Sequence, residues 1–247
     1  LNLKNLDENE NYNLAKGIFF KELKSVSKEK RSVFYNHLIN LTIKLVNHSS
    51  PGSLEEMFYL IKNKLKEGLT DDITESDLPV SKFRDFLLIA VNLGEIKWAN
   101  NFLKNYGPLL PPDNREDHIN LGKALIFFNL KKYSDAMKSL DQINRKNPFF
   151  YTDVYVLKLK AFFEMDRFDE SHNELKNYNE YLRKDRLIPD QLRIYAKEFC
   201  IAYALLIKLR LSPVKKNFYE LEYLLSTKNL IGKKWVFQKM SEIKLND

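Results

Sequence analysis

The chain has 247 residues, 44% of them hydrophobic and 30% charged, and is therefore long enough to bury a substantial core. Its 7 glycines and 8 prolines are too few for collagen or for a proline-rich or low-complexity linker protein. The single cysteine, Cys200, excludes an intramolecular disulfide scaffold and any multi-cysteine zinc or iron–sulfur site. The longest apolar run, residues 199–207, is shorter than the roughly 18 residues that a membrane-spanning helix needs.

The N-terminal residues carry no targeting signal of the secretory kind. The first thirty are polar and charged, without the apolar core of a signal peptide. The chain begins with Leu1 rather than methionine, which is compatible with a fragment or a processed product that has lost a leader or a further domain. Because a lone thiol fits a reducing compartment, we expect a cytoplasmic protein.

Two helices are predicted before residue 70. In residues 28–48, side chains at helical spacing form one stripe that we expect to face the core: Phe34, Leu38, Leu41 and Leu45, with Val33 and His37. Residues 53–67 begin with a capping box, in which Ser53 caps the helix and Glu56 reaches back. The acidic stretch 71–77 is predicted to be a loop, and Pro79 after it suits the first turn of the next helix.

An internal repeat follows residue 80. Three stretches of sequence align with one another: residues 92–106, 129–143 and 164–178. Their first shared position is isoleucine or an aromatic residue: Ile96, Tyr133 and Phe168. The second is a small residue: Ala99, Ala136 and Ser171. The third is leucine: Leu103, Leu140 and Leu175.

The spacing of the repeat predicts stacked helical hairpins. Its units lie 37 and 35 residues apart, and each is expected to be helix, tight turn, helix, with Gly94, Lys131 or Asp166 in the turn. A single helical hairpin cannot bury both of its apolar faces, whereas stacking buries a continuous core. The small residues then allow neighbouring helices to approach closely. We therefore expect an all-α fold, an α-solenoid of stacked antiparallel helical hairpins.

Segment 81–182 resembles tetratricopeptide repeats, whose units are helix pairs of ~34 residues. The residues that carry the resemblance are Ala124, Phe127, Tyr133, Ala136, Leu140 and Pro148. On this basis we expect one continuous solenoid with three parts: degenerate helical hairpins in residues 1–78, a TPR-like core in 79–188, and a C-terminal hairpin with a basic capping helix in 189–247.

The C-terminal part is predicted to form three helices. Residues 190–211 are one long amphipathic pattern, Ser212-Pro213 restarts the chain, and Asn229 to Gly232 precede the last helix. Nine basic residues against four acidic ones make residues 201–247 strongly basic in a chain of formal charge +7. No repeated aromatic–basic platform accompanies these lysines. We interpret the segment as the capping element of the solenoid.

Patterns for catalysis or for metal binding are absent from the sequence. The four histidines lack metal-ligand spacing, and we interpret His37 and His172 as core or boundary residues. The seven glycines are isolated, so that no phosphate-binding loop exists. Cys200 lies in an apolar helical run and is expected to pack as a small hydrophobic residue. We therefore predict no catalytic residue, no cofactor, no metal site and no enzymatic activity.

The resemblance implies that the first helices of successive units line a concave groove for an extended peptide or a partner helix. Transferred to this chain, the groove-facing positions are Arg84, Leu88, Asn92, His118, Leu125, Asn129, Lys160 and Glu164. The leading hypothesis is a non-catalytic scaffold that binds a protein or peptide partner, or another domain of a longer parent chain. A second hypothesis is a helical repeat that binds nucleic acid through its basic C-terminal helices. A third is a sensor or regulatory module of a larger regulator.

Overall fold

The computed structural model describes residues 8–47, 50–69, 79–144 and 148–245. Within these ranges the protein is all-α, with twelve α-helices, two short 3-10 turns and no strand. The α-helices are α1 Glu8–Glu22, α2 Lys28–Asn47, α3 Ser53–Lys66, α4 Val80–Asn92, α5 Ile96–Tyr106, α6 Pro112–Asn129, α7 Tyr133–Asp141, α8 Pro148–Glu164, α9 Phe168–Lys184, α10 Asp190–Leu211, α11 Lys215–Thr227 and α12 Lys233–Glu242. The 3-10 turns are η2 Leu23–Ser25 and η3 Gly107–Leu109. None of the helices in the described ranges combines the length and the apolar character that a bilayer crossing requires.

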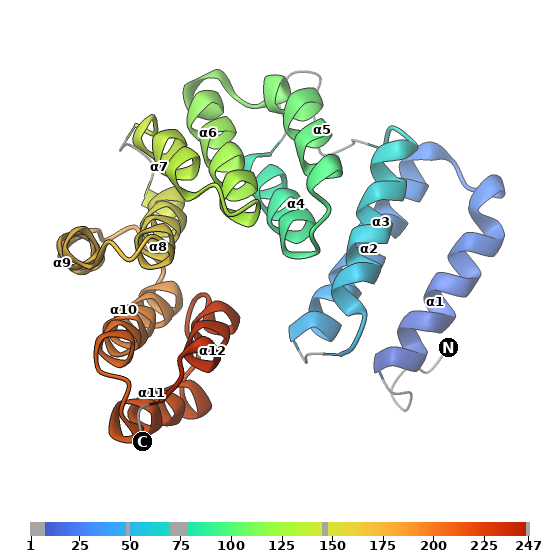
Figure 1. The fold of residues 1–247 in the computed structure, drawn as a ribbon. Coiled ribbons are helices and arrows are strands. Elements are labelled where there is room, and N and C mark those ends of the chain that lie inside the picture. Colours follow the sequence, from blue (N-terminus) through green and yellow to red (C-terminus); the bar gives the residue numbers. More distant parts are fainter. Residues whose placement is uncertain (1–7, 48–49, 70–78, 145–147, 246–247) are drawn as a thin grey trace. The chain divides into compact units, whose positions relative to one another are not determined.

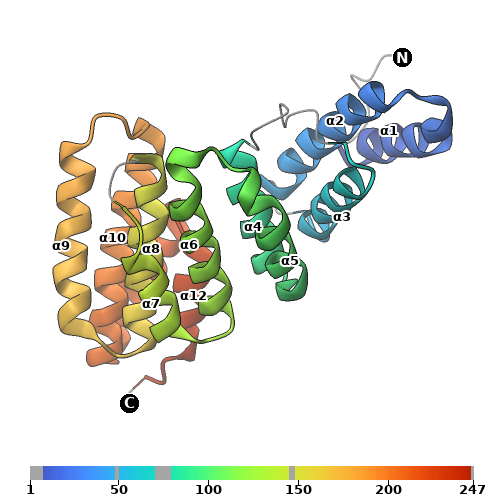
Figure 2. The same ribbon diagram turned by 90° about the horizontal axis from the view of Figure 1, so that it is seen from above.

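The helices form two compact units, Leu1–Asn129 with α1 to α6 and Leu130–Asp247 with α7 to α12. Within each unit most helices pack against the helix next to them in the chain, as Figures 1 and 2 show. This arrangement is compatible with a helical repeat. The three parts predicted from the sequence have boundaries different from those of the two units, and this division remains a prediction. Their first boundary borders residues 70–78, outside the described residues, and the second directly precedes α10.

Three turns share one backbone conformation. The residue with positive φ is Gly94 at 73°, Lys131 at 59° or Asp166 at 53°. The next helix begins two residues later in each case, at Ile96, Tyr133 and Phe168. Residues other than glycine avoid this left-handed region, because their side chain collides with the backbone there. Lys131 and Asp166 therefore adopt it at a cost in conformational free energy. The predicted turns are therefore confirmed, and the aligned positions of the repeat are the first residues of the helices that follow.

The small residues of the repeat are fully buried, as expected. All three have no exposed surface: Ala99, Ala136 and Ser171. Ser171 also holds a polar contact, since its hydroxyl lies 2.7 Å from the phenol oxygen of Tyr203 on α10. Tyr203 in turn donates to the carbonyl of Leu159 on α8 at 2.6 Å. One buried network thus joins α8, α9 and α10.

Each unit has its own apolar core. In the first unit, one cluster is centred on α1 to α3: Tyr12, Phe19, Tyr35, Leu38, Leu45, Leu60 and Leu69. A second cluster joins α3 to α6 and includes Phe58, Phe83, Leu87, Ala99, Phe102 and Ile126. The core of the second unit draws on α8 to α12 and includes Leu159, Phe163, Tyr178, Phe199, Tyr203, Leu221 and Val236. Burial of this apolar surface is the main force that holds the hairpins together.

The predicted core stripe of residues 28–48 is partly wrong. Leu38 and Leu45 are buried, but Phe34 is 46% exposed and Val33 54% exposed. Tyr35, one residue further on, faces the core instead. Its ring meets Phe19 edge to face at 5.0 Å, and its hydroxyl donates to the carboxylate of Glu67, directly after α3, at 2.7 Å. Because this polar contact satisfies the buried phenol, Tyr35 shares the core face with Leu38 and Leu45, and Phe34 lies outside it.

The predicted capping box at the start of α3 is also wrong. The residue before the helix is Gly52, and no side chain caps the first turn. Ser53 lies inside the helix, where its hydroxyl donates to the carbonyl of Ser50 at 2.7 Å. Glu56 pairs with Lys16 of α1 at 2.8 Å. The carboxylate of Glu56 is therefore engaged in a tertiary ion pair and does not accept a hydrogen bond from the backbone at the start of α3.

Candidate functional site

The predicted groove positions of α4 lie on one face of that helix. Arg84, Leu88 and Asn92 recur every four residues, Arg84 and Leu88 being partly exposed and Asn92 exposed. The guanidinium of Arg84 forms an ion pair with Asp85 at 2.8 Å. This face therefore offers a cationic group, an apolar side chain and an amide, in that order along the helix.

The predicted positions of α6 do not share one environment. His118 is buried, and Leu125 packs against the core cluster that joins α3 to α6. Asn129 remains at the surface, and its amide donates to the carbonyl of Val91 at 3.0 Å. This bond holds the C-terminal ends of α4 and α6 together. Of the three predicted residues, only Asn129 therefore extends the surface of the α4 positions.

The predicted positions of α8, in the second unit, contact α12. The carboxylate of Glu164 accepts a hydrogen bond from the indole of Trp235 at 3.0 Å and pairs with Lys239 at 3.0 Å. The ammonium of Lys160 lies 5.5 Å from the centre of the Trp235 ring. Burial lowers the pKa of Lys160 to about 8, although Asp153 and Glu164 act in the opposite direction. In this structure both residues hold the C-terminal helix.

A different groove lies between α3 and α5, in the first unit. Its larger part, of about 640 Å³, is lined by Glu55, Phe58, Tyr59, Lys62, Asn63, Lys66, Leu93, Glu95 and Trp98. A smaller part of about 190 Å³ continues it and is lined by Lys62, Leu65, Lys66, Trp98, Asn101, Phe102, Asn105 and Tyr106. The two parts share Lys62, Lys66 and Trp98. We call this the α3–α5 groove.

Stacked aromatic rings form one wall of the α3–α5 groove. Trp98 and Phe102 lie with ring centres 4.9 Å apart at 12°, and Phe102 and Tyr106 lie 4.7 Å apart at 23°. Phe58 of α3 meets the Trp98 ring edge to face at 4.9 Å. These contacts fix the ring of Trp98, which remains partly exposed, as a preorganised apolar surface.

The charges of the α3–α5 groove are separated along its length. Glu55 and Glu95 lie near the N-terminal ends of α3 and α5, whereas Lys62 and Lys66 lie further along α3. All four side chains are exposed. Among the described residues, none of the four forms an ion pair; the ammonium of Lys62 lies 5.1 Å from the Phe58 ring. The groove therefore presents charges of both signs to a ligand.

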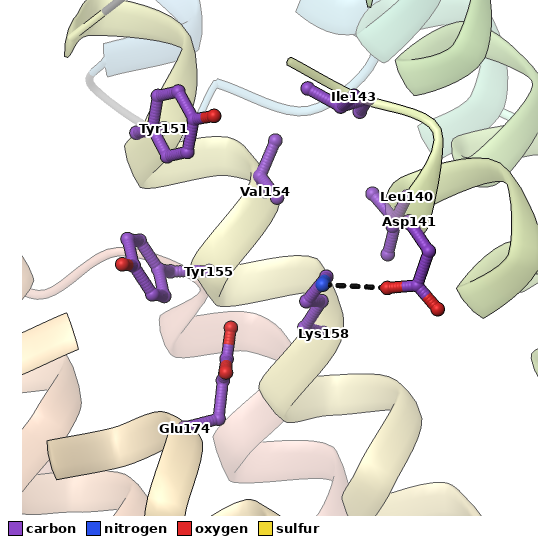
Figure 3. A pocket seen from close by; sticks show the side chains of 8 residues that line it. All are labelled: Leu140, Asp141, Ile143, Tyr151, Val154, Tyr155, Lys158 and Glu174. Atoms are coloured by element: carbon purple, nitrogen blue, oxygen red, sulfur yellow. Dashed lines mark hydrogen bonds and ion pairs between the residues drawn. The ribbon is translucent and has the colours of Figure 1, made fainter. Parts of the chain in front are cut away.

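The second unit has a small polar pocket of about 80 Å³. Figure 3 shows its lining: Leu140, Asp141, Ile143, Tyr151, Val154, Tyr155, Lys158 and Glu174. The ammonium of Lys158 pairs with Asp141 at 2.8 Å, and Tyr155 stacks on Tyr178 at 4.8 Å. The space is enough for two or three water molecules of about 30 Å³ each. It is too small for a peptide side chain together with its backbone.

The described residues contain no group of three or more His, Cys, Asp and Glu side chains that could hold a metal ion. The interpretation of His37 and His172 as core or boundary residues is wrong, because both side chains are exposed. Cys200 is buried, and desolvation raises the pKa of its thiol to about 12. It therefore packs as a small hydrophobic residue, as predicted.

The α3–α5 groove was not predicted from the sequence. Trp98, Phe102 and Tyr106 recur every four residues, a spacing that predicts a ring stack along one helix face. The contribution of α3 was not visible in the sequence, because no motif connects Lys62 and Lys66 with α5.

Comparison of the chain with protein-family models, with curated proteins and with solved structures yields no match.

Proposed function

We propose that the chain is a non-catalytic, tetratricopeptide-like scaffold that binds a protein or peptide partner, or another domain of a longer parent chain. The observation that carries the proposal is the equivalence of the three turns at Gly94, Lys131 and Asp166, each followed by a helix that starts two residues later. Stacked helical hairpins of this kind present extended surfaces between helices, which suit linear peptides. A cytoplasmic location belongs to the same proposal.

The first unit supplies the accessible part of the proposed concave surface. Arg84, Leu88 and Asn92 combine polar groups, which set the register of a peptide, with an apolar side chain, which adds affinity. Asn129 extends this surface from α6. On α8 the corresponding positions contact α12, so the proposal assigns them to holding the C-terminal helix and not to a partner.

The test is affinity purification of the tagged chain from its native lysate, with and without nuclease and at two salt concentrations. We expect a protein that remains bound after nuclease and moderate salt, and that is lost from the double variant Arg84→Glu, Leu88→Asp. The matched control is Lys97→Glu, Lys104→Glu, two exposed positions of α5. Recovery of nuclease-sensitive material alone would refute the scaffold.

One observation favours the second hypothesis, nucleic-acid binding by the basic C-terminal helices. Tyr219 is 61% exposed and Tyr223 71% exposed, one helical turn apart on α11. Lys215 and Lys216 are exposed in the first turn of the same helix. The bases of single-stranded nucleic acids stack on exposed aromatic rings, and their phosphates form ion pairs with lysines nearby. These rings lie on one helix, and the sequence carries no repeated aromatic–basic platform beside the lysines.

The second hypothesis has its own measurement. A fluorescent single-stranded oligonucleotide is titrated with the chain at several salt concentrations. Binding through phosphates requires a steep loss of affinity with salt, and Tyr219→Ala, Tyr223→Ala must weaken it further. Affinity that is unchanged in this variant would reject α11 as the interface.

A further inference from the structure

The dimensions of the α3–α5 groove fit a short extended peptide. Eleven residues separate Glu55 from Lys66 along α3, which at about 1.5 Å per residue is about 16 Å. The same number separates Glu95 from Tyr106 along α5. An extended chain advances about 3.3 Å per residue, so roughly five residues span the groove.

The charges of the groove require a ligand with both signs. Lys62 and Lys66 favour an acidic side chain, whereas Glu55 and Glu95 favour a basic one. None of these four groups is neutralised by an ion pair within the described part of the chain, so a ligand can meet all of them without breaking an ion pair. A peptide with an acidic and a basic end satisfies this pattern, and a ligand of uniform charge does not.

Between the charged ends, the groove offers an apolar surface. The Trp98 ring is held by Phe102 beneath it and by the edge of Phe58 beside it. Because this ring is already held in place, binding a ligand to it costs little side-chain entropy, and tryptophan is a frequent anchor at interfaces. An apolar side chain of the ligand can therefore pack on Trp98 at the centre of the groove, where the two parts meet.

The same features disfavour a nucleic acid in this groove. Phosphates would be attracted by Lys62 and Lys66 but repelled by Glu55 and Glu95. Bases cannot insert into the ring stack, because Phe102 is only 3% exposed and Trp98 already covers one of its faces. A protein ligand is therefore the occupant that the groove chemistry supports.

We propose that the α3–α5 groove binds an extended segment of a partner protein, about five residues long, with an acidic end at Lys62 and Lys66, an apolar side chain on Trp98 and a basic end at Glu55 and Glu95. The proposal deepens the scaffold function and rests on it. It places the peptide on a surface different from that of Arg84, Leu88 and Asn92.

The test measures fluorescence anisotropy of labelled hexapeptide pools with the full chain. One pool has two acidic, two apolar and two basic positions in that order, and a second pool has the reverse order. We expect at least one pool to bind, and Lys62→Glu, Lys66→Glu to weaken binding about tenfold or more. Trp98→Ala should weaken it to a similar extent.

A charge-swap arm separates recognition from damage to the fold. A third peptide pool has lysines in place of the acidic residues. We expect the Lys62→Glu, Lys66→Glu variant to bind this pool more tightly than the original chain does, and an unfolded variant could not show such a gain. Lys97→Glu, Lys104→Glu changes the net charge equally, on α5 outside the groove lining, and should bind like the original chain. Equal binding by the original chain and the Lys62→Glu, Lys66→Glu variant would overturn the proposal, as would binding of neither pool. Binding of a single-stranded oligonucleotide that depends on Lys62 and Trp98 would overturn it in favour of nucleic acid.

The lysate experiment and the peptide experiment together distinguish a failure of the groove assignment from a failure of the scaffold function. If the original chain captures a nuclease-resistant partner but neither hexapeptide pool binds, the scaffold function stands and the groove assignment fails. If no such partner is captured by the original chain, the scaffold function itself fails.

Discussion

The carboxylate of Glu164 accepts a hydrogen bond from the indole of Trp235 at 3.0 Å, although 71 residues separate the two in the chain. The Trp235 ring meets Phe163 edge to face at 5.5 Å and stacks on Tyr203 at 6.4 Å. These contacts fasten α12 to α8 and α10. They involve the face of α8 with Lys160 and Glu164, which the resemblance to tetratricopeptide repeats assigned to partner binding.

Removal of the Glu164 carboxylate should destabilise the chain. Glu164→Ala leaves the Trp235 indole and the ammonium of Lys239 without this acceptor, and the Lys239 side chain is only 14% exposed. We expect the free energy of unfolding to fall by about 1–3 kcal/mol, measured by chemical denaturation. Glu242→Ala removes the more exposed partner of Lys239 and should change it by less than about 0.5 kcal/mol. Equal losses in the two variants would contradict this account.

Lys160 should make stability depend on pH between about 8 and 10. Its pKa is lowered to about 8 in the folded chain, so above that pH the unfolded chain binds more protons than the folded one. Stability therefore rises with pH in this window, by about 1–2 kcal/mol. Above pH 10 the effect reverses, since burial raises the pKa of Tyr203 and other tyrosines.

The measurement is denaturation of the original chain and of Lys160→Met at pH 7.5, 8.5 and 9.5. Lys160→Met should be the more stable at pH 7.5 and should show a flatter pH profile, because its side chain needs no desolvation of a charge. Lys176→Met, at an exposed position of α9, should retain the profile of the original chain. A flat profile in the original chain would contradict the prediction.

In the three equivalent turns, replacing glycine at the position of positive φ should destabilise the chain, and introducing glycine there should stabilise it. Gly94→Ala introduces a side chain at a φ of 73° and should lower the free energy of unfolding by about 1 kcal/mol. Lys131→Gly relieves the same strain at 59° and should raise it by about 0.5 kcal/mol. Lys132→Gly, at a φ of −89°, is the control and should be destabilising. The account fails if Lys131→Gly and Lys132→Gly have the same effect in thermal and chemical denaturation.

Gly122 on α6 allows close packing against α4 and α5. A Cβ at this position would lie 2.7 Å from Cδ1 of Leu103 and 3.0 Å from Cδ1 of Leu87. Gly122→Val should therefore cost about 1–3 kcal/mol of stability through overpacking. Gly17→Val on α1 is the matched control and should be nearly neutral, because nothing lies within 4 Å of the new Cβ. Equal thermal midpoints for both variants would show that α6 has room for the side chain.

Features that depend only on neighbours along the chain are readable in the sequence. The turns at Gly94, Lys131 and Asp166 could be predicted because a tight turn between two helices is set by a few consecutive residues. The burial of Ala99 could be predicted because its equivalents, Ala136 and Ser171, are also small. Periodicity likewise predicted the all-α class, since apolar residues at helical spacing report the helix directly.

Which of two neighbouring faces a helix buries depends on its tertiary contacts. On α2 either Phe34 or its neighbour Tyr35 could face the core. The contacts of Tyr35 with α1 and with Glu67, directly after α3, place Tyr35 there. On α8 the side chains of Lys160 and Glu164 were partner-binding candidates until α12 was seen to contact them. The α3–α5 groove depends in the same way on helices that no local pattern connects. A helical period identifies a face of a helix, but what covers that face depends on residues far away in the sequence, whose contacts form only when the chain is packed.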